Sequence, residues 1–277
     1  VEQHAITHMH LVPTMFHRLL SLPDEVRGRY DVRSLRQIWH GAAPCPVSVK
    51  QAMIEWLGPI IWEYYGATEG LTTIVDSHEW LTRPGTVGRP EDGQVEIRDD
   101  DGAPLPADVP GTVYIQAPDE GRFEYHGDKT KTASTYRGDY YTVGDVGYLD
   151  ADGWLFLTDR SANLIISGGV NIYPAEIEAV LITHPSVGDV AVIGVPSEEW
   201  GEEVKAVVEV QPGLTGSDEL AAELIDFTRR RIAGYKCPRT VDFVARLPRE
   251  DNGKLYKRKL RDAYRAAAIR SDDARSD

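Results

Sequence analysis

Short apolar runs alternate with mixed stretches over the first part of the chain. Three runs have the length and character of buried strands, namely Thr7–Val12, Leu35–Trp39 and Ile60–Tyr65. The stretches between them fit helices at Met15–Leu20, where Pro13 suits a first helical turn, and at Val47–Leu57. Strands separated by helices predict a parallel sheet, so residues 1–79 are expected to form an α/β portion.

The pattern changes after about residue 80, where Gly and Pro become dense and the apolar runs become short. Turn dipeptides such as Asp101-Gly102 and Asp152-Gly153 separate these runs. The pattern predicts an antiparallel meander or a small β-barrel over residues 80–160. Its expected strands are Val95–Arg98, Thr112–Gln116, Tyr140–Val143 and Trp154–Thr158.

A third pattern begins at about residue 164 and predicts a compact α+β domain with its own core over residues 164–265. Residues 161–163 join it to the preceding part. Residues 266–277 are expected to be a disordered tail, because Ser271–Asp277 has no apolar residue except Ala274. The expected elements are a helix at Pro174–Thr183, strands at Val187–Val195 and Val204–Val210, and a helix at Ser217–Ile232 capped by Ser217.

The predicted fold is therefore α/β plus α+β. Residues 1–160 are a partial large domain, with a parallel α/β portion and a small β-barrel, and a compact α+β C-terminal domain follows. The chain begins Val1-Glu2-Gln3-His4, with neither an initiator Met nor a leader, and runs directly into an apolar segment. We interpret this start as a cut through a longer protein; a processed mature terminus is the alternative.

The amino-acid composition argues against several classes of function. The formal net charge is −14, from 44 acidic and 30 basic residues, which argues against non-specific binding to nucleic acid or to an anionic membrane. No apolar run approaches the length of a membrane-spanning helix. The two cysteines, Cys45 and Cys237, are far apart in the sequence and favour a reducing, cytoplasmic location. A homodimer is compatible with the sequence.

Two candidate sites follow predicted strands. The strand Ile60–Tyr65 runs into Gly66-Ala67-Thr68-Glu69-Gly70, where a hydroxyl could donate to a phosphate and a carboxylate could hold Mg²⁺. Asp145 ends the run Tyr141–Asp145 and could accept both hydroxyls of a ribose. The simpler interpretations are an ordinary turn and a turn-forming Asp, and each segment alone leaves them open.

Two further segments carry glycine and basic residues. Residues 159–178 join an apolar strand to a helix through Gly168-Gly169, whose exposed backbone could lie along an extended ligand. Residues 247–258 place Lys254 on a turn just after Gly253, where its charge could reach a phosphate. A solvated basic tail helix is the simpler interpretation of the second segment.

Together and in this order, the four segments resemble the adenylate-forming superfamily of acyl-CoA synthetases, luciferases and peptide-synthetase adenylation domains. The resemblance extends from about residue 5 to about residue 265. The run Trp39–Pro46 and the segment 159–178 are most similar to bacterial fatty-acyl-CoA ligases. The resemblance implies the carboxyl-terminal half of an ATP-dependent, AMP-forming acid–CoA ligase.

The resemblance also implies residue roles. Lys254 would bridge the carboxylate, ribose and α-phosphate oxygens and stabilise the charge on phosphorus during adenylation. With it, Glu69 and Thr68 complete the implied catalytic set. The implied nucleotide contacts are the adenine-flanking Gly41, Ala42 and Ala43, the adenine-stacking Tyr65, the α-phosphate hydroxyl of Thr68, the Mg²⁺-associated carboxylate of Glu69, and the ribose partners Asp145 and Arg160.

In this superfamily the small domain rotates between an adenylating and a thioester-forming pose. Gly168 and Gly169 would line the tunnel for the pantetheine arm of coenzyme A. Trp200, Tyr235 and Arg239 would hold its nucleotide by stacking and charge; without the resemblance, Trp200 is simply a surface-packed aromatic. The implied ligands are therefore ATP or AMP, Mg²⁺, coenzyme A and a small carboxylic acid.

Three departures from the superfamily pattern affect these expectations. Ala162-Asn163 replaces a usual Lys-Asp, although Asn tolerates the unusual torsions of a hinge at residues 161–163. Val143-Gly144-Asp145 replaces a usual Thr-Gly-Asp, so one hydroxyl is lost. The Gly/Ser/Thr-rich phosphate-binding loop is not in the sequence, and we expect the 277 residues alone to be inactive.

The acid pocket is expected around the mixed apolar and aromatic residues His10, Val12, Met15, Trp39 and His40. Such a lining suits a fatty, aryl or steroid-like acid and not a polar amino acid. Two other functions stay open. One is an adenylation enzyme that loads a carrier protein, and the other is a non-catalytic fragment that binds nucleotide or coenzyme A.

Overall fold

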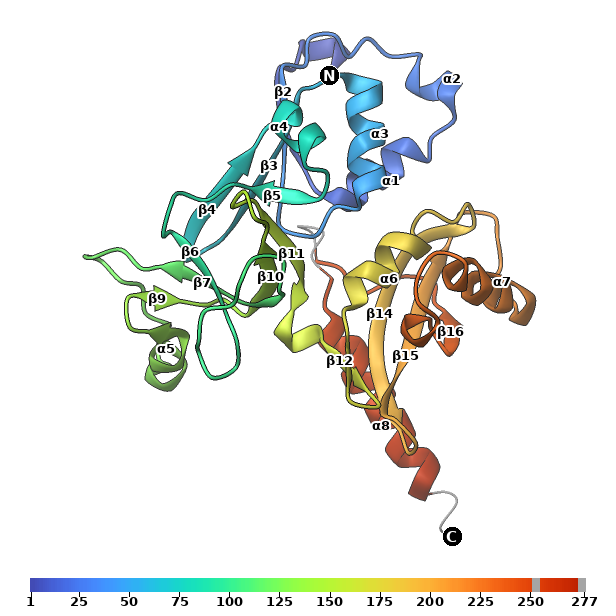
Figure 1. The fold of residues 1–277 in the computed structure, drawn as a ribbon. Coiled ribbons are helices and arrows are strands. Elements are labelled where there is room, and N and C mark those ends of the chain that lie inside the picture. The colour runs from blue at the N-terminus through green and yellow to red at the C-terminus, as the bar shows by residue number, and fades with distance from the viewer. Residues whose placement is uncertain (251–254, 274–277) are drawn as a thin grey trace. The chain divides into compact units, whose positions relative to one another are not determined.

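A computed structural model of the chain describes residues 1–250 and 255–273. It divides into two compact units, unit 1 (Val1–Ser161) and unit 2 (from Ala162 onward), which run from blue to yellow-green and from yellow to red in Figure 1. No helix in these two ranges has both the length and the hydropathy that crossing a membrane requires. Each unit has its own sheets and cores.

The first sheet of unit 1 has the strand order β1-β2-β3-β4. Its first three strands are parallel, as the alternation of apolar runs predicted, and β4 adds an antiparallel edge. The helices α1 (Pro13–Leu20) and α3 (Val47–Leu57) lie side by side and pack Phe16 and Met53 against the sheet. The strands are β1 (His8–Leu11), β2 (Gln37–His40), β3 (Ile61–Ala67) and β4 (Gly70–Val75). Short helices lie at Glu2–His4, α2 (Asp24–Arg27) and α4 (Ser77–Thr82).

The second sheet of unit 1 is antiparallel and open. Its strand order is β5-β11-β10-β7-β9-β8, with β6 paired to β7, and within the described chain the end strands β5 and β8 do not pair with each other. The expected small β-barrel is therefore wrong, because closure needs continuous staggered pairing around the ring and several strands are too short to supply it. The strands are β5 (Thr86–Gly88), β6 (Val95–Arg98), β7 (Gly111–Gln116), β8 (Tyr136–Arg137), β9 (Tyr140–Tyr141), β10 (Asp145–Leu149) and β11 (Leu155–Arg160), and α5 is Lys129–Thr135.

Unit 2 is an α+β domain built on a long hairpin. Strands β14 (Val187–Ser197) and β15 (Gly201–Val210) pair along their length, and β16 (Thr240–Phe243) adds in parallel to β15. A short hairpin of β12 (Ile165–Ser167) and β13 (Val170–Ile172) extends the sheet. The helices are α6 (Pro174–Leu181), α7 (Asp218–Arg229) and α8 (Lys257–Asp273), and short 3-10 helices lie at Ser161–Asn163 and Gly234–Lys236.

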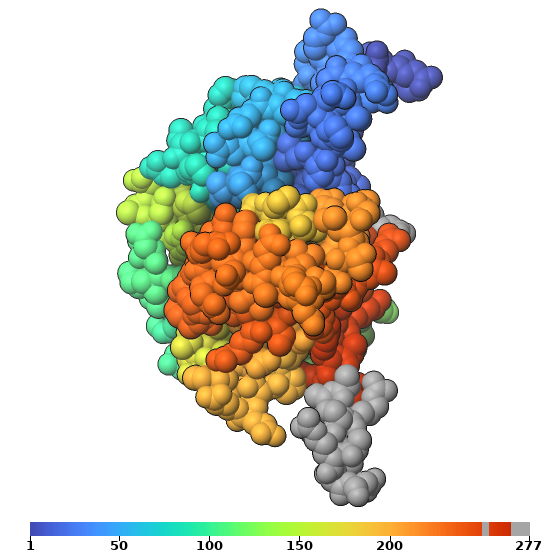
Figure 2. Space-filling view, turned by 90° about the vertical axis from the view of Figure 1, so that its right-hand side faces the viewer, coloured from blue at the N-terminus to red at the C-terminus, as the bar shows by residue number. Residues whose placement is uncertain are grey.

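Both faces of this sheet are covered, because successive side chains of a strand point to opposite sides. Val190 and Val192 pack with residues of α6 and α7 in one core, and Ala191 and Ile193 pack with residues of α8 in another. Figure 2 shows the space-filling surface of unit 2, coloured from yellow to red, as one closely packed mass of atoms. The helix α8 continues to Asp273, where the sequence predicted disorder from residue 266, and the alanine-rich start of this segment has high helix propensity.

Candidate functional site

Asp145 is held between two partners at the start of β10. The hydroxyl of Tyr65, on β3, donates to Oδ2 of Asp145 at 2.9 Å. Nε of Arg160 donates to Oδ1 at 3.0 Å, and the two residues face each other in the β10–β11 ladder. Asp145 is buried, whereas the Arg160 side chain is 49% exposed. The cluster therefore joins the two sheets of unit 1 and presents one cation at the surface.

The electrostatics of the cluster suit hydrogen bonding to a sugar. Burial raises the pKa of Asp145, while the charge of Arg160 and the hydroxyl of Tyr65 act in the opposite direction. Burial and the neighbouring Asp145 also raise the pKa of Tyr65, so its hydroxyl remains a donor. Each carboxylate oxygen can accept two hydrogen bonds. Asp145 thus keeps acceptor capacity beyond its two protein partners, as a contact to ribose hydroxyls requires.

The turn between β3 and β4 carries Thr68 and Glu69. Thr68 is exposed. Oε1 of Glu69 accepts from the hydroxyl of Tyr125 at 2.7 Å, and Lys131 lies 3.7 Å from the centroid of the Tyr125 ring. Burial, with Glu69 nearby, raises the pKa of Tyr125 to about 12. A neutral tyrosine therefore orients the Glu69 carboxylate, a contact that sequence reasoning missed.

The loop Gly41-Ala42-Ala43 follows β2 directly. A Cβ on Gly41 would lie 2.7 Å from the Tyr64 ring, so only glycine fits there without displacement. Ala42 is exposed and has φ of 67°, a left-handed conformation that is uncommon for alanine. Because β2 and β3 are parallel neighbours, this loop and the Thr68-Glu69 turn lie at the same edge of the sheet. The structure thus gathers these predicted nucleotide contacts within unit 1.

No cluster of three or more His, Cys, Asp or Glu side chains in the described ranges could hold a metal ion by itself. Magnesium commonly uses one or two protein carboxylates and takes its other ligands from water and substrate phosphates. The Glu69 carboxylate, oriented by Tyr125, fits that kind of site. The residues present therefore suit Mg²⁺ that arrives with a nucleotide.

In unit 2, Gly168 and Gly169 form the two-residue turn of the β12–β13 hairpin. Their φ values are 57° and 80°, which a tight hairpin turn requires and glycine adopts readily. The Gly168 N–H donates to the Trp200 carbonyl at 2.9 Å, and a Cβ on Gly168 would lie 2.7 Å from the Trp200 ring. The turn is exposed, so its backbone is accessible.

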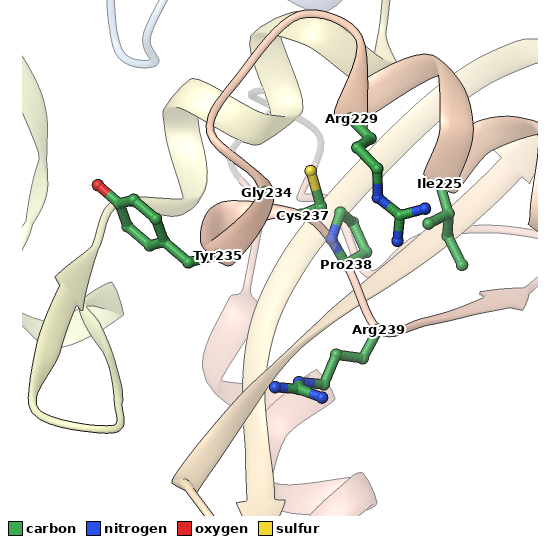
Figure 3. Close-up of a pocket in the computed structure, with 7 residues that line it drawn as sticks. All are labelled: Ile225, Arg229, Gly234, Tyr235, Cys237, Pro238 and Arg239. Atoms are coloured by element: carbon green, nitrogen blue, oxygen red, sulfur yellow. The ribbon is translucent and has the colours of Figure 1, made fainter.

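The Arg239 guanidinium lies over the Trp200 ring at 5.0 Å from the centroid. Trp200 is 37% exposed and Tyr235 is 60% exposed, which leaves aromatic surface accessible to a base. Tyr235 and Arg239 also line a pocket of about 420 Å³ (Figure 3). Its other lining residues are Ile225, Arg229, Gly234, Cys237 and Pro238.

Lys254 lies outside the described residues, so its role stays a prediction from the sequence. The flanking residues Arg249 and Leu255 form an isolated antiparallel bridge, and Oδ1 and Oδ2 of Asp189 both accept from the Arg249 guanidinium. Asn163 lies at the end of a short 3-10 helix, Ser161–Asn163. The hinge at residues 161–163 likewise stays a prediction.

The geometry of strand β2 contradicts the expected acid pocket, which was to include both Trp39 and His40. Trp39 and His40 are successive residues of β2 and point to opposite faces of the sheet, so they cannot line one pocket together. His40 is 0% exposed and packs edge-on against Phe16 in the core. Trp39 packs against Trp62 on the other face, and His10 accepts or donates a hydrogen bond with the Tyr64 hydroxyl at 3.0 Å. Of the other two residues, Val12 is buried and Met15 is exposed.

A buried ion pair lies next to His40. Nζ of Lys50 donates to Oε2 of Glu63 at 2.6 Å, and the Lys50 side chain is fully buried. Burial lowers the pKa of Lys50 and raises that of Glu63, while their mutual attraction opposes both shifts. The sequence indicates that Lys50 is buried, because residues three and four apart on a helix share a face and Lys50 has this spacing to the apolar Met53 and Ile54.

Comparisons with known proteins point to one enzyme family. The model of the AMP-binding enzyme family matches residues 1–121, and the model of the AMP-binding enzyme C-terminal domain matches residues 176–254. The chain is 35% identical to the mitochondrial acyl-coenzyme A synthetase ACSM3 of Mus musculus over 84% of this chain and 41% of that protein. It is 36% identical to the feruloyl-CoA synthase of an Amycolatopsis species over 94% of this chain and 52% of that protein.

Solved structures show the same likeness. The anthranilate CoA ligase AuaEII, in complex with anthranoyl-AMP, superposes with a TM-score of 0.86 at 30% identity, over 97% of this chain and 52% of that one. The chain belongs to the family of AMP-binding, adenylate-forming enzymes. It spans about half the length of the curated relatives that it matches.

Proposed function

We propose that the protein to which this chain belongs is an AMP-forming acid–CoA ligase. The observation that carries the proposal is Asp145, held by Tyr65 and Arg160. Its carboxylate suits the two hydroxyls of an adenosine ribose, and the exposed Thr68 suits a phosphate. Membership of the AMP-binding enzyme family supports a nucleotide as the ligand.

The first step of the proposed reaction joins the acid to AMP. An oxygen of the substrate carboxylate attacks the α-phosphorus of ATP, and pyrophosphate leaves. The Thr68 hydroxyl would donate to an α-phosphate oxygen, and Lys254 would add a positive charge near the phosphorus. Glu69 would hold Mg²⁺, which offsets the negative charge of the phosphates. Asp145 and Arg160 would fix the ribose, and Tyr65 would lie against the adenine beside Gly41, Ala42 and Ala43.

The second step transfers the acyl group. The thiol of coenzyme A attacks the acyl carbon, the bond to AMP breaks, and a thioester forms. The exposed Gly168-Gly169 turn offers room for the pantetheine arm, and Trp200, Tyr235 and Arg239 offer aromatic and positive surface for its nucleotide. The Arg239–Trp200 contact is the feature that favours free coenzyme A as the acceptor.

The proposed acid is hydrophobic, either fatty or aryl, which would give the enzyme a place in fatty-acid and lipid metabolism. The names of the relatives, an acyl-coenzyme A synthetase and a feruloyl-CoA synthase, support this class. A carrier protein is the alternative acceptor, because the chain is also 34% identical to a fatty acid–[acyl-carrier-protein] ligase of Streptomyces coeruleorubidus. A cytoplasmic location and a homodimer stay predictions.

The decisive measurement is AMP release by the product of the complete reading frame. We expect release to depend on an acid from a fatty and aryl panel, and thioester to form with free coenzyme A. Release without thioester, restored by a carrier protein, would assign the alternative acceptor. No release with any acid would leave only the role of a non-catalytic nucleotide-binding protein.

The 277-residue chain itself allows a direct test of the ribose contact. We expect it to bind AMP more tightly than 2′-deoxy-AMP in calorimetry, and Asp145→Ala to remove the difference. We expect no turnover, because the β- and γ-phosphates of ATP need a cradle of backbone N–H donors that the sequence does not supply. Turnover near that of the complete enzyme would contradict this expectation.

A further inference from the structure

The pocket beside Arg239 contains a second arginine, Arg229, that the proposed reaction does not use. The pocket lies between the end of α7 and the segment 234–239, and both arginines line it. Figure 3 shows them on either side of Pro238, with Ile225 next to Arg229. Two guanidinium groups on one pocket of about 420 Å³ form a place where an anion can be held from two sides.

Two neighbouring basic side chains have other partners, and the one thiol that lines the pocket is neutral. Lys236 donates to Glu176 at 2.6 Å, and Arg231 lies over the Phe227 ring at 3.5 Å. Burial raises the pKa of Cys237, so this thiol stays uncharged. The positive charge at the pocket therefore comes from Arg229 and Arg239.

Arg229 is available to a ligand. Its ion pair with Asp226 is 3.5 Å long, and both side chains are 62% exposed. Exposed pairs of this kind contribute little free energy, so a doubly charged anion can replace Asp226 as the partner of Arg229.

Arg239 connects the pocket to the aromatic surface at Trp200, because its side chain lines the pocket and its guanidinium lies over the Trp200 ring. A nucleotide whose base contacts Trp200 would thus extend its sugar phosphate past Arg239 toward Arg229. We propose that Arg229 binds the phosphate monoester on the ribose of an adenine nucleotide, and so makes the site specific for coenzyme A over its 3′-dephospho form. This proposal rests on the proposed use of coenzyme A.

The test compares two probes, coenzyme A and 3′-dephospho-coenzyme A, which differ only in this phosphate. Calorimetry with the 277-residue chain should show tighter binding of coenzyme A by about ten- to a hundredfold, the size expected for charge-assisted hydrogen bonds. Arg229→Ala should remove most of that preference and leave the affinity for 3′-dephospho-coenzyme A unchanged. Arg229→Lys should keep part of it, because a point charge remains.

Arg230→Ala is the matched control, since Arg230 is the next residue and does not line the pocket; it should keep the full preference. An unchanged preference in Arg229→Ala, or a wild-type chain that binds both probes equally or neither, would overturn the proposal. Thermal unfolding of each variant verifies the fold. Ligase activity of the complete protein is a separate readout, so failure of the proposed function and failure of the Arg229 assignment are distinguishable.

Discussion

Tyr65 and Asp145 are 80 residues apart in the sequence, yet the Tyr65 hydroxyl donates to the Asp145 carboxylate at 2.9 Å inside unit 1. The bond joins the parallel sheet to the antiparallel sheet, because Tyr65 lies on β3 and Asp145 begins β10. Both side chains are buried. The contact therefore stabilises the fold and orients the carboxylate that we assign to the ribose.

Tyr65→Phe should lower the free energy of unfolding by about 1 kcal/mol, the net value of one hydrogen bond, and more if Asp145 is left short of a partner. Urea unfolding followed by tryptophan fluorescence measures the change. Tyr64→Phe is the matched control, because the neighbouring hydroxyl contacts the exposed His10. If both variants lower the free energy of unfolding by the same amount, the Tyr65–Asp145 hydrogen bond does not stabilise the fold more than an exposed one does.

His40 should make unit 1 sensitive to mild acid. The His40 side chain is fully buried, and its ring nitrogens make no hydrogen bond within the described chain, although Nε2 lies 3.5 Å from Oε2 of Glu63. Burial lowers the pKa of His40 well below 6.5. The unfolded chain therefore binds a proton near pH 6.5 that the folded chain does not bind. Stability from neutral His40 is present above that pH and is lost as the pH falls below it, by up to about 1.4 kcal/mol per pH unit.

The variant His40→Phe should flatten the dependence of unfolding free energy on pH between about pH 6.5 and pH 5. It keeps an aromatic ring against Phe16 and removes the titrating group. His78→Gln, at an exposed position of α4, should keep the wild-type slope. An unchanged slope in His40→Phe would show that other groups cause the pH dependence.

Lys50→Met should destabilise the chain by about 3–5 kcal/mol, because it leaves the Glu63 carboxyl buried without its cation. The double variant Lys50→Met with Glu63→Gln should recover part of the loss, since no buried charge remains. Arg122→Met, which breaks an exposed pair with Asp139, should change stability by less than about 1 kcal/mol. A double variant no more stable than Lys50→Met would show that packing, and not charge, determines the loss.

Lys254→Ala in the complete enzyme should lower the rate of adenylate formation by about two to three orders of magnitude, because a charge at the reacting phosphate is lost. Thioester formation from pre-made acyl-adenylate should stay near the wild-type rate, because the small domain that carries Lys254 is expected to rotate away from the site before that step. Rapid-quench assays of the two half-reactions measure both. Lys259→Ala, on α8, serves as the control. Equal losses in both half-reactions would contradict the role given to Lys254.

Local sequence patterns were sufficient to predict the helices and strands with strong hydrophobic periodicity. The helix at Val47–Leu57 has the predicted ends, and the parallel strands of unit 1 follow from apolar runs separated by helices. Strand β4 was not predicted, because the Thr68-Glu69 turn that reverses the chain contains no strong turn dipeptide. The barrel was mispredicted for a related reason: a sequence of short strands does not specify whether the end strands meet.

The sequence by itself determined the types of chemical group available, the two kinds of sheet and the family resemblance, since these depend on residue type and on spacing over a few positions. Only the tertiary structure decided which groups meet. In the folded chain the Tyr65 hydroxyl donates to the Asp145 carboxylate, and Trp39 and His40 point to opposite faces of the sheet. Arg229 and Arg239 line the same pocket. These contacts depend on strand pairing and helix packing between distant segments, which the free energy of the whole fold selects and no short stretch of sequence contains.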